Sequence, residues 1–319
     1  MVKKKLRAGV IGFGYLGYHH ARIYNELQDV DLVGIVDISE ERRIKAESEL
    51  KIPAYSKLSE LIEKGIDIAS VATPTTTHSE VSLPLLDAGI HLLVEKPIAD
   101  TISNARKIVE KAKERNCTLQ VGHIERFNGA VRQLFNLIEN PRFIECHRLS
   151  PFPNRGTDVS VVLDLMIHDI DIVLKLTGSE VVQMDAVGVP VFSESEDIAN
   201  VRLRFASGCV ANITASRVSM DRLRKIRIFS NREYVSTDYT SQNLLLYTKK
   251  QGPIPNNGNV MDMIDITPIN VSSEEPLRAE ITSFVNCVRN GTSPEVTGED
   301  ALKALELCWK IIEQIRAQK

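Results

Sequence analysis

Short apolar segments alternate with amphipathic ones through the first third of the chain, as expected of strands that alternate with helices. We predict strands over 6–11, 31–36, 66–72, 91–94 and 118–121, with helices over 15–25, 40–50, 79–88 and 102–116. Strands and helices that alternate through short connections form a parallel sheet with helices on both faces. The pattern therefore predicts a doubly wound α/β domain over residues 1–123.

After about residue 123, strands follow one another through tight turns. Between 201 and 205, Val201, Leu203 and Phe205 alternate with two arginines, as in a strand with one packed face. Further strands are predicted from 143 onward and over 209–215, 225–229, 234–238 and 244–247, then a loop over 249–264 that is long enough for a lid or contact arm, and helices over 276–289 and 299–317. We predict an α+β domain over 124–319 with a mostly antiparallel, open sheet.

Composition excludes several classes of protein. A net charge of −3 gives no reason to expect nucleic acid or an anionic membrane as a partner. Apolar runs are too short for a membrane span, and glycines interrupt the run after Lys3–Lys5, so we expect no signal peptide. The five cysteines are scattered and odd in number, which fits a reducing cytoplasm better than a disulfide framework.

A glycine-rich turn follows the first predicted strand and opens the first helix. It reads Gly12-Phe13-Gly14-Tyr15-Leu16-Gly17. The first glycine suits a tight turn, the second a close approach of a pyrophosphate, and the third the packing of helix on strand. The alternative is a glycine-rich turn without a ligand.

Asp37 closes the second strand 20 residues after Gly17, where a carboxylate accepts hydrogen bonds from a ribose diol. This supports a dinucleotide-binding Rossmann domain. Asp37 would repel a 2′-phosphate, so NAD is favoured over NADP. Arg42 and Arg43 are close enough to moderate that preference, although a solvated helix face explains them equally simply.

Two later strands end in polar residues that would meet at the same edge of the sheet. One ends near Thr73 and Pro74, with His78 following, where the nicotinamide end of a cofactor would lie; Thr77 has the alternative role of a helix N-cap. The other ends in Glu95-Lys96-Pro97, which places a lysine in the same crevice. An ordinary Glu–Lys surface pair is the alternative for the latter.

A strongly apolar helix is predicted from Asp164 to a stop at Gly178. At 100° per residue, Asp164, His168, Asp171 and Lys175 share one narrow stripe. An unpaired carboxylate is costly to bury, so the stripe either faces water or lines a cavity. Together with Lys96 and the glycine-rich turn, it is better interpreted as a cavity lining, with Asp171 and Lys175 continuing toward solvent.

With these three motifs in this order, the chain resembles the glucose–fructose oxidoreductase / inositol dehydrogenase / MocA family over essentially its whole length. The resemblance implies an NAD(P)-dependent sugar or polyol oxidoreductase. It places Lys96, Asp164 and His168 at the junction of cofactor and substrate, with Glu95 on the cofactor side.

Oxidation of an alcohol sends a hydride to the nicotinamide and a proton to a base. His168 is suited to take that proton at neutral pH, Asp164 to orient its imidazole, and Lys96 to favour the developing alkoxide. Lys96 as the base is an open alternative. An Asp–His pair could also be half of a metal site with His123 and Glu125, but the sequence offers no complete ligand set, so we expect no metal.

A narrower resemblance lies in residues 122–128 and 147–152, which read GHIERFN and HRLSPF. They are similar to the branch of the family that oxidises the 3-hydroxyl of UDP-N-acetylglucosamine, whose 3-keto product passes to a PLP-dependent aminotransferase in lipid A synthesis. Gly129 departs from the proline usual in that branch. Ser160–Leu163 differs from the glycine-rich run of many other family members, which weakens any transfer from inositol-type enzymes and suits the nucleotide-sugar branch.

A UDP-sugar brings a diphosphate, which forked arginines bind well. The candidates are Arg126, Arg148, Arg155, Arg217 and Arg224, of which Arg126 and Arg155 are our chosen substrate ligands. Tyr15 and Phe127 could flank the ring or base, and a place in the core is the alternative for Phe127.

Two other functions stay open from the sequence. One is a family dehydrogenase of another substrate, such as the corresponding uronic acid or inositol. The other is a non-catalytic NAD-sensing regulator, which the presence of Lys96, Asp164 and His168 together disfavours. The open sheet face with alternating apolar residues predicts a homodimer or homotetramer.

Overall fold

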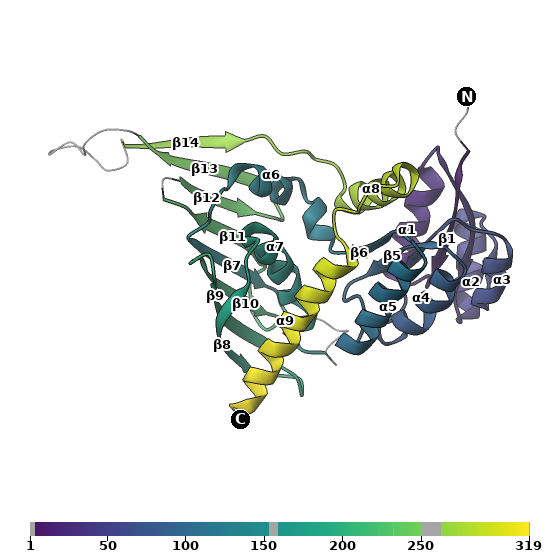
Figure 1. Ribbon diagram of the computed structural model, residues 1–319, viewed down its shortest axis with the longest axis horizontal. Coiled ribbons are helices and arrows are strands. Elements are labelled where there is room, and N and C mark those ends of the chain that lie inside the picture. The colour runs from purple at the N-terminus through teal and green to yellow at the C-terminus, as the bar shows by residue number, and fades with distance from the viewer. Residues whose placement is uncertain (1–3, 153–158, 232, 251–262, 319) are drawn as a thin grey trace. The chain divides into compact units, whose positions relative to one another are not determined.

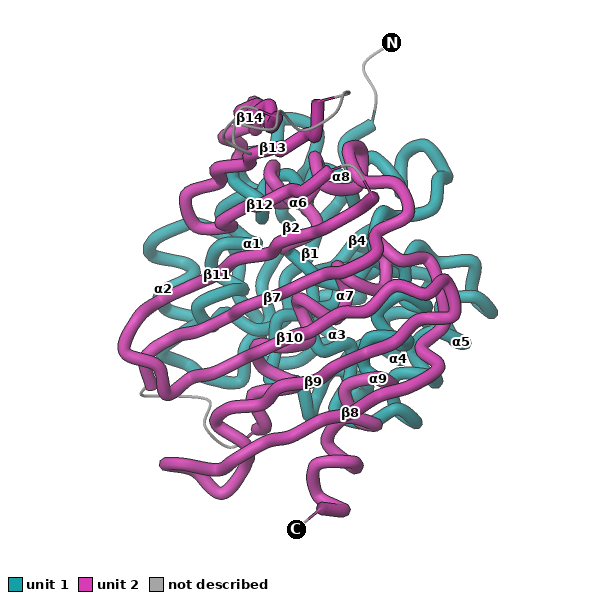
Figure 2. Tube along the Cα trace, turned by 90° about the vertical axis from the view of Figure 1, so that its left-hand side faces the viewer, with its two compact units in different colours: residues 1–124, 275–305 teal, residues 125–274, 306–319 magenta. Residues whose placement is uncertain are grey.

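The computed structural model describes residues 4–152, 159–231, 233–250 and 263–318, and the chain divides into two compact units (Figures 1 and 2). Unit 1 contains residues 1–124 and 275–305, and unit 2 contains residues 125–274 and 306–319. Residues 275–305 were expected in the second domain and instead belong to unit 1. The reason is that helix α8 (Pro276–Asn290) packs on α1 and β5 of that unit.

Unit 1 is built on a six-stranded sheet in which every pairing is parallel. Its order is β3-β2-β1-β4-β5-β6, with β1 at Leu6–Ile11, β2 at Val30–Val36, β3 at Ala54–Tyr55, β4 at Ile68–Val71, β5 at His91–Glu95 and β6 at Leu119–Gly122. The order reverses between β1 and β4. In open parallel sheets ligands bind at the carboxyl ends of the strands at such a switch point. The predicted doubly wound α/β domain is confirmed.

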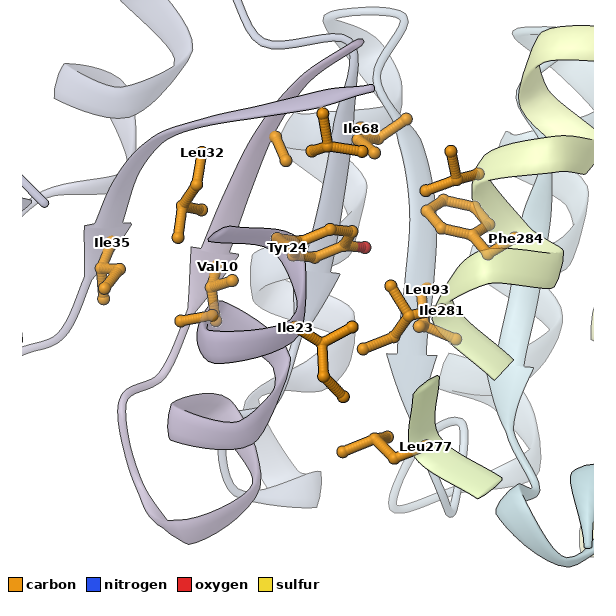
Figure 3. Packing of buried hydrophobic residues seen from close by; sticks show 14 of the residues in the cluster. Val10, Ile23, Tyr24, Leu32, Ile35, Ile68, Leu93, Leu277, Ile281 and Phe284 are labelled. Atoms are coloured by element: carbon orange, nitrogen blue, oxygen red, sulfur yellow. The ribbon is translucent and has the colours of Figure 1, made fainter. Parts of the chain in front are cut away.

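Helices connect these strands: α1 (Tyr15–Glu26), α2 (Glu40–Leu50), α3 (Leu58–Glu63), α4 (His78–Asp87) and α5 (Ile102–Glu114). Figure 3 shows one core layer, in which Tyr24 of α1 lies beside Leu93 of β5 and the Ile281–Phe284 side of α8. These side chains are almost completely buried. Truncating a buried aromatic such as Phe284 to alanine costs about 3–5 kcal/mol, so α8 is an integral part of the unit.

Unit 2 contains an eight-stranded sheet in the order β14-β13-β12-β11-β7-β10-β9-β8. The pairing of β7 with β10 is parallel and the others are antiparallel. The strands are β7 (Phe143–Leu149), β8 (Val181–Val189), β9 (Ile198–Phe205), β10 (Val210–Ser216), β11 (Leu223–Phe229), β12 (Glu233–Asp238), β13 (Asn243–Lys249) and β14 (Ile264–Ile269). The predicted mostly antiparallel sheet is confirmed.

Helices cover one face of this sheet. They are α6 (Gly129–Leu137), α7 (Ile167–Thr177) and the end of α9 (Gly298–Ala317), a helix that unit 1 and unit 2 share. Figure 2 looks onto the other face, over which no described element of unit 2 lies. That face is mixed in character: Glu145 pairs with Arg227 at 3.1 Å, while aromatic rings stack side by side from β11 to β13. The alternation of apolar residues expected there is therefore only partly found.

Several elements were not predicted, namely β3, α3, α6, β8 and β14. Most of the expected loop over 249–264 lies outside the described residues, because these stop at 250 and resume at 263. None of the helices in the described ranges is long and apolar enough to cross a membrane.

Candidate functional site

The glycine-rich turn joins β1 to α1 as the sequence predicted. Gly12 has a φ of 90°, which side chains rarely adopt, and a Cβ there would lie 2.6 Å from the Ala72 carbonyl oxygen. A Cβ on Gly17 would lie 1.8 Å from the Gly12 oxygen, so only glycine lets the helix start here. The turn is thus fixed by close backbone approaches.

At Gly14 a Cβ would have open space around it, whereas at Gly12 and Gly17 it would meet close backbone atoms. A Cβ on Gly14 would have a single described neighbour within 4 Å, an Arg42 nitrogen at 4.0 Å. This open space at the first turn of α1 fits a close approach of a pyrophosphate to the backbone, where helix N–H groups and the helix dipole favour anions. The residues present therefore fit a dinucleotide cofactor. Phe13 is buried, whereas Tyr15 is 81% exposed and Leu16 39% exposed.

Asp37 stands at the end of β2 beside this turn. Its Oδ2 accepts a hydrogen bond from the Phe13 N–H at 2.7 Å, and its Oδ1 accepts one from the Ser39 N–H at 2.8 Å. A carboxylate accepts about four hydrogen bonds, so capacity remains for a ribose diol. The fold therefore fixes Asp37 where the sequence analysis expected a ribose contact.

Two arginines follow Asp37 on α2. Arg42 is largely exposed, as a solvated helix face would be, and its Nη1 lies 3.5 Å from Asp37 Oδ2. Arg43 instead donates to the carbonyl oxygens of Asp37 and Ile38, at 2.9 and 3.0 Å. Arg43 therefore supports the turn after β2, a structural role that the sequence analysis did not assign.

The segment after β4 is held by side-chain contacts. Thr77 Oγ1 donates to the Pro74 oxygen at 2.8 Å and lies 2.9 Å from Thr73 Oγ1, and its side chain caps no backbone N–H of α4. His78 is 1% exposed, with Nε2 2.9 Å from the Thr73 oxygen and Nδ1 3.0 Å from the Pro97 oxygen. Burial lowers the pKa of His78. Its ring joins the loops after β4 and β5, whereas a direct cofactor contact was expected.

The position of Glu95 also differs from the one expected. Its carboxylate was expected on the cofactor side or in a surface pair with Lys96, yet it is buried and Oε1 lies 2.8 Å from His20 Nε2. Burial alone would raise the pKa of Glu95, but the hydrogen bond from His20 and the charges of His20 and Lys96 hold it below the ordinary value. Glu95 therefore faces the interior, while Lys96 is half-buried and precedes a cis bond to Pro97.

In unit 2, Asp164 and His168 lie at the start of the predicted helix, and both are half-buried. The structure differs locally, because Val162–Met166 forms a π-helical turn before α7 begins at Ile167. Ser160 starts this turn: its oxygen atoms accept from the backbone N–H groups of Val162 and Asp164, at 3.2 and 3.1 Å. Isolated π-turns occur often at functional sites.

The stripe ends differently from the prediction. Lys175 is exposed, but Asp171 is 1% exposed and was wrongly expected to continue toward solvent. Arg126 explains this, since its Nε and Nη2 donate to the two Asp171 oxygens at 2.7 and 2.6 Å. Arg126 is itself 2% exposed, so the structure gives it a partner within the core where a substrate diphosphate was expected.

Of the other described arginine candidates, two form buried ion pairs and one is exposed. Arg148 donates to Glu125 and Asp169, and Arg217 donates to Asp197, all within the interior of unit 2. Arg224 is the exposed candidate, 3.9 Å from Glu125. Arg155 lies outside the described residues. Phe127 is 2% exposed, which favours its alternative place in the core.

A polar cluster in unit 1 was missed by the sequence analysis. His20, Glu95 and Glu280 each offer one ligand atom, and these atoms lie within 4.8 Å of one another. All three residues are buried. Glu280 occupies a core-facing position between Leu277 and Phe284 of α8, a signal that the apolar pattern of that helix already contained.

Comparison with known proteins assigns both parts of the chain. Residues 6–123 match the oxidoreductase family with an NAD-binding Rossmann fold, and residues 122–235 match the GFO/IDH/MocA C-terminal domain. The chain is 36% identical over 284 residues to UDP-N-acetylglucosamine 3-dehydrogenase of Acidithiobacillus ferrooxidans, covering 89% of this chain and 88% of that one. A solved structure of that enzyme has a TM-score of 0.91 at 32% identity, with 98% of both chains covered.

A second relative has a different substrate in its name. The chain is 29% identical over 335 residues to myo-inositol 2-dehydrogenase of Thermotoga maritima, with 98% of each chain covered. Both relatives are dehydrogenases, and both family domains are present in order. The chain therefore belongs to the GFO/IDH/MocA family of oxidoreductases, and its N-terminal Rossmann domain binds a nicotinamide cofactor.

Proposed function

We propose that this protein is an NAD-dependent dehydrogenase that oxidises the 3-hydroxyl of UDP-N-acetylglucosamine to the 3-keto sugar. The observation that carries the proposal is the similarity over most of the chain to a UDP-N-acetylglucosamine 3-dehydrogenase. The sequence motifs GHIERFN and HRLSPF point to the same branch.

The reaction divides between a hydride and a proton. A bound nicotinamide supplies the acceptor for the hydride that leaves C3. We assign the hydroxyl proton to His168, with Asp164 four residues before it to orient the imidazole and stabilise its charged form. Lys96 donates a hydrogen bond to the same oxygen and favours the developing negative charge. Catalysis of this kind needs no metal ion.

NAD is the preferred cofactor in this proposal. The fixed carboxylate of Asp37 suits a ribose diol and repels the 2′-phosphate of NADP. The exposed guanidinium of Arg42 beside it weakens that discrimination without reversing it. We therefore expect measurable but poorer use of NADP.

For the diphosphate of the substrate, we propose Arg224 and Arg155. Arg224 is exposed and is held only loosely by Glu125 at 3.9 Å. Arg126 and Phe127, also predicted as substrate ligands, have their side chains committed to the core of unit 2. We propose that these two residues support the binding site through their packing in the core and do not contact the substrate.

One alternative has a specific observation behind it. The relative from T. maritima acts on myo-inositol and matches a larger share of the chain, at lower identity. An inositol dehydrogenase would need no site for a diphosphate. A response to UDP-sugars and none to inositol separates the two.

Two further features belong to the proposal. The 3-keto product is a substrate for transamination, so a PLP-dependent aminotransferase is the pathway neighbour, with lipid A bearing 3-amino sugars as the destination in the cytoplasm. The sheet face that no described element of unit 2 covers would join copies into a homodimer or homotetramer.

The direct test incubates purified protein with NAD and a panel of UDP-sugars and reads NADH at ~340 nm by the absorbance of reduced nicotinamide. An amino-group donor with a suitable aminotransferase is added in a parallel sample, because removal of the ketone pulls an unfavourable equilibrium forward. Formation of NADH with UDP-N-acetylglucosamine supports the proposal. NADH with myo-inositol alone overturns it.

A further inference from the structure

The cluster of His20, Glu95 and Glu280 includes the first residue of the Glu95-Lys96-Pro97 segment and has no role in the proposed reaction. Glu280 is 0% exposed, and neither of its carboxyl oxygens has a hydrogen-bond partner within the described residues. An ionised, unpaired carboxylate in such a place is very unfavourable. Something must therefore neutralise this group.

The basic group of the cluster, the imidazole of His20, bonds to Glu95 and not to Glu280. A chain of hydrogen bonds runs from Tyr24 to Ser70 at 2.9 Å, from Ser70 to His20 Nδ1 at 2.9 Å, and from His20 Nε2 to Glu95 at 2.8 Å. When Ser70 donates to Nδ1 and the ring donates from Nε2, each group in this chain donates to the next, and Glu95 is the final acceptor. Glu95 is thus the charged member and Glu280 is its close neighbour.

We propose that the Glu95–Glu280 pair holds one proton, carried by Glu280, and that Glu280 thereby acts as a neutral positioning residue for the Glu95 carboxylate beside Lys96. Two carboxyl groups this close and this deeply buried do not both ionise. Glu95 then accepts a hydrogen bond from His20 and has a neutral carboxyl group, not a second charge, within 4.8 Å. The positioning part rests on the role of Lys96 in the proposed function.

The charges around the pair agree with this distribution. Burial, together with the nearby carboxylates of Glu95 and Glu295, raises the pKa of Glu280 well above the ordinary value. Glu95 instead faces His20, Lys96 and His78, which all favour its charged form. Tyr24 is also buried, and burial raises its pKa well above the ordinary value, so it remains a neutral donor.

The proton is detected by infrared spectroscopy of the full-length protein at neutral pH. A protonated carboxylic acid has a carbonyl stretch well separated from carboxylate bands, and the difference spectrum of wild type against Glu280→Gln should contain it. Glu49→Gln, at an exposed position on α2, is the matched control and should leave no such band. Absence of the band from the Glu280→Gln difference overturns the proposal.

The positioning role is tested by comparing an apolar with an isosteric substitution. Glu280→Leu should lower kcat about tenfold, with a smaller effect on KM, because the group acts through Glu95 and not on bound substrate. Glu280→Gln, which keeps a neutral polar group of the same shape, should restore kcat to within about threefold of wild type. Equal losses in both variants would overturn the positioning role.

The test of the shared proton can be separated from the test of the proposed function. If no UDP-sugar is oxidised, the proposed function fails, while the infrared band still decides where the proton is, and NADH binding read by fluorescence replaces kcat. Stoichiometric Mn²⁺, Fe²⁺ or Zn²⁺ in purified wild type, absent from Glu280→Gln, would instead identify a metal site and overturn the shared proton.

Discussion

Arg126 and Asp171 form a buried bidentate ion pair, in which Nε and Nη2 lie 2.7 and 2.6 Å from the two carboxylate oxygens. The pair joins the segment before α6 to α7, the helix that follows Asp164. Both side chains are almost completely buried. Removal of either partner leaves the other charge without compensation, which is the costly case for a buried pair.

We therefore expect Arg126→Ala to lower the free energy of unfolding by about 3–5 kcal/mol. Urea denaturation followed by circular dichroism measures this change. The exposed Arg204→Ala on β9 is the control and should shift stability by about 0.5 kcal/mol or less. If Arg126→Ala is as stable as the control but loses affinity for UDP-sugars, Arg126 is a substrate ligand after all.

Asp197 gives a pH-dependent contribution to stability. Burial would raise the pKa of Asp197, but hydrogen bonds from Ser193, the Phe192 N–H and Arg217 hold it well below the ordinary value of 3.8. Because the folded pKa is depressed, the stabilisation is complete above about pH 5 and is lost as the pH falls through 3.8 and below.

Asp197→Asn should therefore be less stable than wild type at pH 7, and its free energy of unfolding should fall less between pH 5 and pH 3. Urea midpoints across that range measure the difference. Asp185→Asn, at an exposed position on β8, should follow the wild-type curve. Parallel curves for wild type and Asp197→Asn would show that Asp197 is not charged in the way described.

Asp37 should decide the cofactor. Asp37→Ser removes the carboxylate that repels a 2′-phosphate and leaves Arg42 available to it, so kcat/KM for NADP relative to NAD should rise by about tenfold. Steady-state rates with both cofactors at a fixed substrate concentration give the ratio. An unchanged ratio would mean that Asp37 only supports the glycine-rich turn through the Phe13 N–H.

His168→Ala should lose about 10²–10⁴-fold in the rate of hydride transfer while NADH binding is retained, because the variant lacks the proton acceptor. Stopped-flow absorbance and NADH fluorescence measure the two properties. Asp164→Asn should give a smaller loss, since it removes only the orienting charge. If Lys96→Met lowers the rate of hydride transfer more than His168→Ala does and abolishes the pH dependence of that rate, Lys96 is the base.

The oligomeric state tests the open face of the β8–β14 sheet. Light scattering at micromolar concentration should give the mass of a dimer or tetramer. Val187, 55% exposed and paired with Asn200 of β9, lies on that face by register. Val187→Lys should lower the mass without unfolding the protein, and a wild-type monomer would contradict the assignment.

The nucleotide half of this molecule could be predicted because its signals are local. The turn at Gly12 needs a positive φ, and Asp37 follows a strand at a fixed separation, so both are visible as short patterns. The arginines are different. Arg126 meets Asp171 from 45 residues away, and no periodicity along one helix reveals that partner.

Two errors have definite physical causes. A spacing of 100° per residue grouped Asp171 with residues that face solvent, because it considers one helix in isolation. In the structure, the buried guanidinium of Arg126 pairs with Asp171 inside the core. The prediction also assumed 100° per residue from Asp164 onward. The π-helical turn at Val162–Met166 departs from that angle, so Asp164 does not follow the predicted spacing. The return of α8 to unit 1 depends on packing between segments far apart in sequence.

The central claim is oxidation at C3 of a UDP-N-acetylhexosamine, and isotope transfer tests it most directly. The protein is incubated with NAD and UDP-N-acetylglucosamine carrying deuterium at C3 only, and the reduced cofactor is examined by mass spectrometry. We predict one deuterium in the NADH and a slower hydride-transfer step than with unlabelled substrate. Unlabelled NADH formed at the normal rate would show oxidation at another carbon and contradict the account.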